Sequence, residues 1–227
     1  MKYIKLLFLS LIFSGSLIYS QETNGKSGFI SLNTGTFISS IDQFSKTYDS
    51  RFGFIYGLEV AIANTARTYF FIKVSYFAKS GTPVTNDFDY SSGSLIFVKV
   101  NKEGSAKFTQ LLMNEGFIYN LFLDSDWTLG LNGGITFCLV SKVEKNARGD
   151  TYYSTDASGM FGVFIGAALE KKFNDSHVSV FLEPQYNYVK SNVLIINSTT
   201  NNVYIGNYGG LNLSAGIRFY FKEIKLH

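Results

Sequence analysis

The sequence predicts an all-β fold, a single antiparallel up-and-down transmembrane β-barrel of about eight strands. Past residue 27, bulky apolar residues alternate with small or polar ones, which turns side chains to opposite faces of a sheet. The composition favours strands, with 22 Phe and 15 Tyr against 2 Pro. Short and long connections also alternate along the chain, as they do in outer-membrane barrels.

The N-terminus has the pattern of an export signal. Lys2 and Lys5 precede an apolar run at 6–18, which suits the core of a signal peptide and is too short for a comfortable membrane anchor. We therefore predict a signal peptide at 1–20 and one barrel domain at 21–227; a buried first helix is the alternative. If Lys2 and Lys5 are set aside with the signal peptide, 18 of the 20 Lys and Arg remain, against 17 Asp and Glu. This nearly neutral balance does not indicate a nucleic-acid-binding surface.

Eight segments carry the two-residue pattern. They span 28–38, 52–63, 68–79, 108–122, 127–140, 160–172, 178–189 and 211–221. In the first four, the bulky residues that share one face are, in order, Ile30, Leu32 and Ile38; Phe54, Tyr56, Leu58, Val60 and Ile62; Phe70, Ile72, Val74 and Tyr76; Met113 and Phe117. Glu115 falls on the bulky face of the fourth segment, so we expect a β-bulge there that turns it inward.

The last four segments repeat the pattern. Their bulky faces carry Leu129, Leu131, Ile135, Phe137 and Leu139; Phe161, Val163, Ile165 and Leu169; Val180, Leu182, Tyr186 and Tyr188; Leu213, Ala215, Ile217, Phe219 and Phe221. Pro184 interrupts the seventh segment, where it cannot donate a backbone hydrogen bond, and this predicts a bulge or a distorted pair.

The opposite faces carry Gly, Ser, Thr, Asn and a few charges. The charged residues on these faces are Glu59, Lys73, Glu170, Glu183 and Arg218. A soluble sandwich packs its bulky residues inside and exposes its charges, so the reverse arrangement predicts a lipid-facing wall around a narrow polar lumen. We expect the inward charges to pair in a structural network, because an isolated charge out of water is costly. A solute or proton path is the alternative.

The connections give the barrel an orientation. Residues 64–67, 124–126 and 174–177 form short polar turns, whereas long polar loops are predicted at 39–51, 80–107, 143–159 and 190–208. Short turns are typical of the periplasmic end. Three aromatic residues near strand ends, Tyr69, Phe70 and Trp127, are predicted to form an aromatic belt.

The longest loop contains an apolar patch beside lysines. The patch consists of Leu95, Ile96 and Phe97, with Lys99 and Lys102 beside it. A hairpin that continues the barrel wall is one interpretation, and a contact site for a partner is the other.

Enzymatic and metal-binding patterns are missing from the sequence. The two histidines are His177, in a short turn, and His227, at the terminus, so neither accompanies a nucleophile or a ligand set in a long loop. Cys138 follows the strand pattern and is predicted to be buried or lipid-facing. We therefore predict no catalytic residue, no cofactor and no metal site.

Three stretches resemble the PorT-like, porin-family outer-membrane barrels of Bacteroidetes. They are 129–134 (LGLNGG), 181–186 (FLEPQY) and 213–219 (LSAGIRF). The resemblance implies an eight-stranded barrel in which Glu183 and Arg218 point inward, and it implies no single activity. Pro184 and the extension 222–227 beyond Phe221 depart from the family pattern.

These features predict a monomeric, non-enzymatic protein of the cell outer membrane, surrounded by outer-membrane lipid. It would act through its extracellular loops, in surface interaction or in envelope or secretion assembly, with an envelope or surface protein as partner. One alternative is a narrow pore for small solutes. Another is a soluble periplasmic lipocalin-like binding protein, whose bulky faces would point inward.

Overall fold

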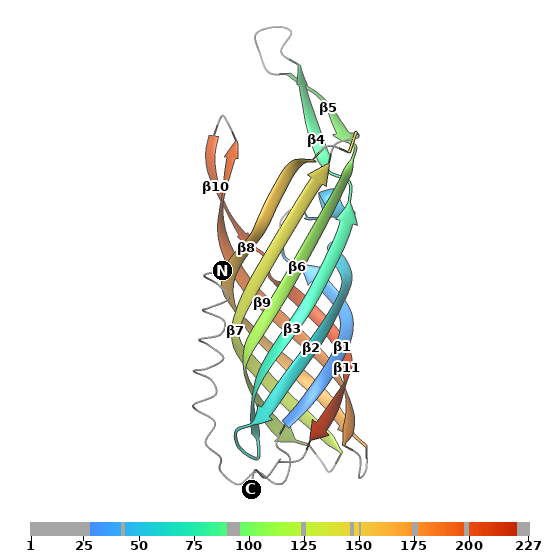
Figure 1. Cartoon of the computed structure of the whole chain (residues 1–227), viewed down its shortest axis with the longest axis vertical. Helices are drawn as coiled ribbons and strands as arrows, with labels where there is room; N and C mark the ends of the chain where they lie inside the picture. Colours follow the sequence, from blue (N-terminus) through green and yellow to red (C-terminus); the bar gives the residue numbers. More distant parts are fainter. Residues whose placement is uncertain are drawn as a thin grey trace.

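A computed structural model describes residues 28–41, 44–89, 96–123, 126–145, 148–149, 151–173, 177–197 and 200–221 (Figure 1). The predicted signal peptide lies outside these residues. Eight strands form the barrel: β1 (Gly28–Ser39), β2 (Phe52–Ala63), β3 (Thr68–Gly81), β6 (Ser105–Phe122), β7 (Trp127–Lys145), β8 (Thr151–Lys172), β9 (Val178–Asn197) and β11 (Gly210–Phe221). Each pairs antiparallel with the next in this order, and β11 pairs with β1. The predicted closed, up-and-down barrel is confirmed.

The remaining elements lie at the end with the long connections. Helix α2 (Phe44–Tyr48) is in the β1–β2 connection, and β4 (Val84–Asp89) pairs with β5 (Ile96–Lys102) in a hairpin that extends away from the barrel (Figure 1). Strands β10 (Thr200–Asn207) and β11 both pair with β9. Strand β10 pairs with residues 190–197 of β9 and β11 pairs with residues 178–187, and the register is the same in both ladders. Within the described residues, no helix has the length and apolar character needed to cross a membrane.

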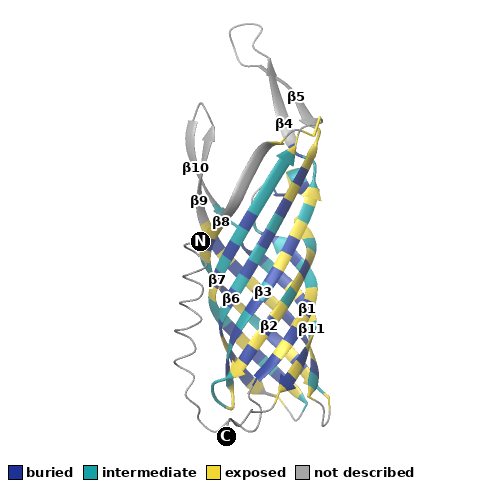
Figure 2. Ribbon diagram, viewed as in Figure 1, coloured by how far each residue is buried: buried dark blue, intermediate teal, exposed yellow. Residues whose placement is uncertain are grey.

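Side chains alternate between the two faces of the wall. In the barrel strands, wherever burial is described, buried residues alternate with exposed or intermediate ones (Figure 2). The exposed residues are bulky and apolar, as Phe54, Ile165 and Leu182 illustrate, whereas the residues between them point into the lumen. This arrangement contradicts the lipocalin-like alternative, which requires the bulky faces to line the interior.

Three barrel strands extend five or more residues beyond their predicted bounds. Strand β7 has 19 residues, β8 has 22 and β9 has 20, whereas β1 and β11 have 12 each. A strand of about ten residues crosses a bilayer at the usual tilt. The residues added to β7 and β8 are largely polar, and those added to β9 include the unbroken apolar run 193–196. Neither stretch shows the alternation of bulky and small residues that would have predicted a strand.

Pro184 distorts the ladder without a bulge. Strand β9 pairs with β11 through Pro184, opposite Leu213. On its other side, the β8–β9 ladder stops after the pair Gly166–Gln185 and resumes in the same register at Leu169–Leu182. The expected distorted pair is therefore present, because proline lacks the N–H that this ladder needs.

The bulge expected at Glu115 is absent. Glu115 lies opposite Ile72 on one side and Ile135 on the other, and the register is continuous in both ladders. It therefore points outward with Phe117, and the prediction that it turns inward was wrong. A one-residue shift would have reversed every later side chain of β6, which costs more than placing one carboxyl group on the outer wall.

A charged substitution on the outer face of the barrel tests whether that face contacts lipid. Ile165 is 69% exposed and lies opposite Gly133 and Tyr186, away from both rims. We expect Ile165→Arg to lower the free energy of unfolding in phospholipid vesicles by about 2–4 kcal/mol, because a charge near the bilayer midplane is costly. The control Ile165→Leu should change it by less than about 1.5 kcal/mol. Guanidinium titrations followed by Trp127 fluorescence measure both, and an Arg variant as stable as the wild type would contradict the lipid-facing wall.

Candidate functional site

Five charged side chains meet inside the barrel. They come from β2, β3, β8, β9 and β11, and we call them the charge layer: Glu59, Lys73, Glu170, Glu183 and Arg218. Each is at most 2% exposed. Each occupies the inward parity of its strand, so strand alternation alone directs all five toward the lumen.

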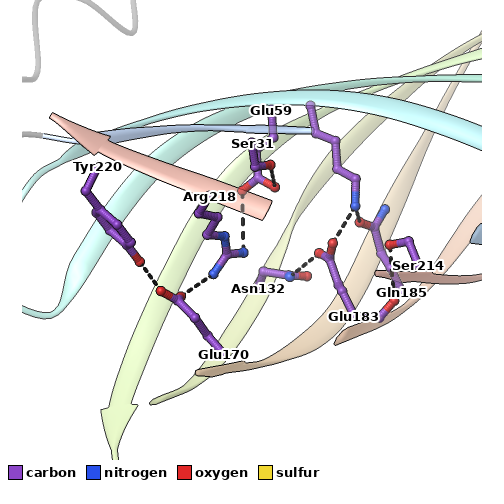
Figure 3. Close-up of polar contacts among 10 residues, drawn as sticks. Ser31, Glu59, Asn132, Glu170, Glu183, Gln185, Ser214, Arg218 and Tyr220 are labelled. Atoms are coloured by element: carbon purple, nitrogen blue, oxygen red, sulfur yellow. Dashed lines mark hydrogen bonds and ion pairs between the residues drawn. The ribbon is translucent and has the colours of Figure 1, made fainter. Parts of the chain in front are cut away.

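Lys73 and Glu183 form an ion pair across the lumen. The Lys73 Nζ lies 2.5 Å from Glu183 Oε2 and also donates to Gln185 Oε1 at 3.3 Å (Figure 3). The second carboxylate oxygen, Glu183 Oε1, accepts a hydrogen bond of 2.8 Å from Asn132 Nδ2. Both carboxylate oxygens therefore have partners, which reduces the cost of burying this charge.

Arg218 organises the other half of the charge layer. Its Nη1 donates to Glu170 Oε2 at 2.6 Å, and the Tyr220 hydroxyl donates to Glu170 Oε1 (Figure 3). The guanidinium group stacks between two rings, with its Cζ 4.6 Å from the centre of Phe29 and 4.4 Å from that of Phe181. Such stacking suits a planar, weakly hydrated cation.

Glu183 and Arg218 lie on adjacent strands but are not each other's close partners. In the β9–β11 register, Ser214 lies opposite Glu183 and Ser179 lies opposite Arg218. The four-residue offset separates the two charges, so each finds its close partner on a strand farther around the barrel. Sequence places side chains on a face, and only the register decides which of them meet.

Two aromatic clusters share the lumen with the charge layer. At the end with the long connections, α2 contributes Phe44 and Tyr48, whose rings lie 4.4 Å apart, and Phe44 also contacts Phe108 at 5.1 Å. This upper cluster further includes Phe37 and Phe77. The lower cluster consists of Phe29, Tyr69, Phe71, Phe164 and Tyr220, with smaller apolar residues.

These clusters were not predicted, because the inner faces were expected to carry small, polar or charged side chains. A signal was present, since Phe29, Phe37, Phe71 and Phe77 share the parity of the inward polar residues of their strands. The lumen is thus filled by charged, amide and aromatic side chains. In the described part of the chain, no three His, Cys, Asp or Glu side chains are grouped as metal ligands.

The three residues predicted to form an aromatic belt do not all lie on the outer side of the barrel. Phe70 and Trp127 lie on the outer side at the end with short turns, whereas Tyr69 is only 7% exposed and its ring lies 5.6 Å from that of Phe29. Tyr69 therefore belongs to the lumen, and its assignment to the belt was wrong because it has the inward parity of β3.

The apolar patch and Cys138 lie in different parts of the structure. Ile96, Phe97, Lys99 and Lys102 belong to β5 of the projecting hairpin, and Leu95 falls outside the described residues. Cys138 is buried inside the barrel, where its Sγ accepts a hydrogen bond from Gln110 Nε2 at 3.1 Å.

Removing one member of the Lys73–Glu183 pair should be more harmful than removing both. We expect Lys73→Met to lower the free energy of unfolding by about 3–5 kcal/mol, because it leaves a buried carboxylate without its cation. The double variant Lys73→Met/Glu183→Gln should recover most of that loss. A double-mutant cycle by denaturant titration, completed with Glu183→Gln, measures the coupling, and additive effects would argue against the pair.

Arg218 should not tolerate lysine. We expect Arg218→Lys to lower the free energy of unfolding by about 2 kcal/mol, since lysine keeps the charge but loses the stacking between Phe29 and Phe181. The matched control is Arg67→Lys, in an exposed turn, which should change stability by less than about 0.5 kcal/mol. Equal stability of the two variants in thermal or denaturant unfolding would show that stacking contributes little.

Comparison with known proteins identifies the fold. The structure resembles Neisserial surface protein A (NspA), with a TM-score of 0.52 and 14% sequence identity over 86% of this chain and 97% of that one. It also resembles the outer membrane protein OprG from Pseudomonas aeruginosa, with a TM-score of 0.53 and 9% identity over 89% of this chain and 100% of that one. No protein-family model and no curated protein matches the sequence.

At these identities the likeness concerns the fold alone. That fold is the closed eight-stranded barrel of outer-membrane proteins, and this chain carries the apolar outer wall that such a barrel needs in lipid. The chain is an outer-membrane β-barrel protein.

Proposed function

We propose that this protein is a non-enzymatic outer-membrane barrel that acts through its extracellular hairpins, in surface interaction or in envelope or secretion assembly. The observation that carries the proposal is the filled lumen. The charge layer and two aromatic clusters occupy it, and α2 contributes the buried Phe44 and Tyr48 to one of these clusters. Because the lumen is filled, the function resides in the outward surfaces of the molecule.

The hairpins offer such surfaces. Strands β7, β8 and β9 are about twice as long as a bilayer crossing requires. The β4–β5 hairpin and the β9–β10 hairpin extend beyond the barrel wall on the same side (Figure 1). We include the patch Ile96, Phe97, Lys99 and Lys102 in β5, with the adjacent Leu95, as the proposed contact with an envelope or surface protein.

The resemblance to PorT-like barrels supports the same proposal. It rests on the stretches 129–134, 181–186 and 213–219, and it adds weight to a role in secretion without implying a single activity. We further propose that residues 1–20 serve as the export signal and that the protein acts as a monomer in the outer-membrane lipid. The filled lumen speaks against an open pore for small solutes, since eight-stranded barrels are just wide enough for their side chains.

Loop replacement in living cells tests the proposal. In a strain that lacks the gene, we would replace residues 84–102 or 191–206 with a short Gly-Ser linker and measure surface attachment and protein secretion. We expect both variants to insert as heat-modifiable barrels and at least one to lose the activity of the wild-type gene. The control is Phe44→Ala/Tyr48→Ala, which changes the lumen and should retain that activity.

Conductance separates this proposal from the pore. The purified wild-type protein should give no steady current steps in planar lipid bilayers. Regular channel steps from the wild type, or full activity of both loop variants, would overturn the proposal.

A further inference from the structure

Two exposed lysines are neighbours on the outer face of the barrel wall, at the end with the long connections. Lys107 of β6 lies opposite Val143 of β7. Lys145 is the next outward residue of β7, opposite Ser105 of β6. The β6–β7 register is continuous through these pairs, so both lysines have the outward parity of their strands. Such diagonal neighbours are about 7–8 Å apart, and two lysine side chains at this spacing can contact one ligand.

Neither of these lysines has an acidic partner within the described part of the chain. The ion pairs there involve other cations, and Glu144, which adjoins Lys145 in the sequence, pairs with Lys142 at 2.6 Å. Glu144 also has the inward parity of β7, whereas Glu103 lies in the exposed connection before β6. Two positive charges on the outer face therefore lack an acidic partner, which favours an anionic ligand.

The outer face becomes apolar two rows below Lys107. Toward the short turns, the residues that lie opposite one another on β3, β6 and β7 are Ser80, Lys107 and Val143; Ala78, Thr109 and Ser141; Tyr76, Leu111 and Leu139; Val74, Met113 and Phe137. Lys107 precedes Leu111 by four residues, which is about 13 Å along the strand and about 10 Å along the membrane normal at the usual tilt. The headgroup region of a bilayer is about 5–8 Å thick on each side, and lysine side chains can bend toward it, so both ammonium groups can contact headgroups.

We propose that this part of the wall, which we call the lysine face and define by Ser80, Ser105, Lys107 and Lys145, binds a membrane lipid that carries a phosphate group. The two lysines hold the phosphate as paired point charges, and the two exposed serine hydroxyls donate hydrogen bonds to it. The acyl chains of the lipid lie along the apolar rows below. In the usual orientation of such barrels the long connections are extracellular, so the lipid belongs to the outer leaflet.

A lipid matches the lysine face better than a soluble anion does. Charged and hydroxyl groups are followed by apolar side chains on one continuous surface, in the order in which a phospholipid presents its headgroup and its chains. A soluble phosphate would contact the lysines and leave the apolar rows unused. At the opposite end of the barrel, the outward Lys171 has a partner within the chain, since its Nζ lies 5.4 Å from the centre of the Trp127 ring. This inference does not depend on the activity of the extracellular hairpins.

Three ligands that share parts of one structure test the site. The full chain, refolded in an uncharged detergent, would be titrated with dioleoyl phosphatidic acid, with dioleoyl glycerol, which has the chains without the phosphate, and with glycerol 3-phosphate, which has the phosphate without the chains. Native mass spectrometry counts the ligands bound to each chain. We expect phosphatidic acid to bind at about one per chain, and each of the other two to bind about tenfold more weakly or less, because each makes only part of the contacts.

Two double variants separate the lysine face from general charge. Lys107→Gln/Lys145→Gln should lower the affinity for phosphatidic acid about thirtyfold, because each lysine near a charged lipid contributes about 1 kcal/mol. The control Lys46→Gln/Lys190→Gln removes two exposed lysines at the same end of the barrel, from α2 and β9, and should keep the wild-type affinity. Heat-modifiability on a gel verifies that both variants are folded barrels.

Three outcomes would overturn the proposal. Equal affinities of the two double variants for phosphatidic acid would mean that the lysine face is not the site. Binding of dioleoyl glycerol as tightly as phosphatidic acid would mean that the wall selects chains and not phosphate. Binding of glycerol 3-phosphate as tightly as phosphatidic acid would make the lysine face a site for a soluble phosphate.

Discussion

The rest of this structure depends on the need to pair backbone hydrogen bonds in lipid. A sheet inside a bilayer has no water to satisfy its edges, so β1 must meet β11 and close the barrel. Closure with eight strands fixes a narrow lumen, and that lumen must be filled by the inward half of the side chains. Small residues such as Gly57 are as necessary there as large ones, because they make room for their neighbours.

The lumen is filled by side chains of two kinds. Aromatic rings form two clusters, and buried charges and amides lie between and beside them, as Arg218 does between Phe29 and Phe181. Buried charges add little net stability when paired, but they penalise any register that separates them. The ion pairs join β3 to β9 and β8 to β11, strands that are not adjacent, so they tie the register of one part of the wall to that of another.

The sequence was sufficient for the fold but not for the contacts inside it. Alternation placed Glu59, Lys73 and Arg218 on the inner faces, because a two-residue period fixes the face of each side chain. It could not show that Arg218 meets Glu170, since that depends on strand register and barrel shear. Tyr69 and Glu115 were misplaced for a different reason: the first was judged by its position near a strand end and the second by its charge, whereas strand parity decides both. The added ends of β7, β8 and β9 were not predicted because their sequences show no alternation of bulky and small residues.

Pro184 interrupts one ladder of the barrel wall. Where the β8–β9 ladder is interrupted, the backbones of the two strands are joined by the pairs on either side. Opening this stretch breaks fewer backbone hydrogen bonds than opening an uninterrupted ladder of equal length. The wall is therefore not uniform around its circumference, and this stretch of β8–β9 resists local separation less than a continuous ladder would.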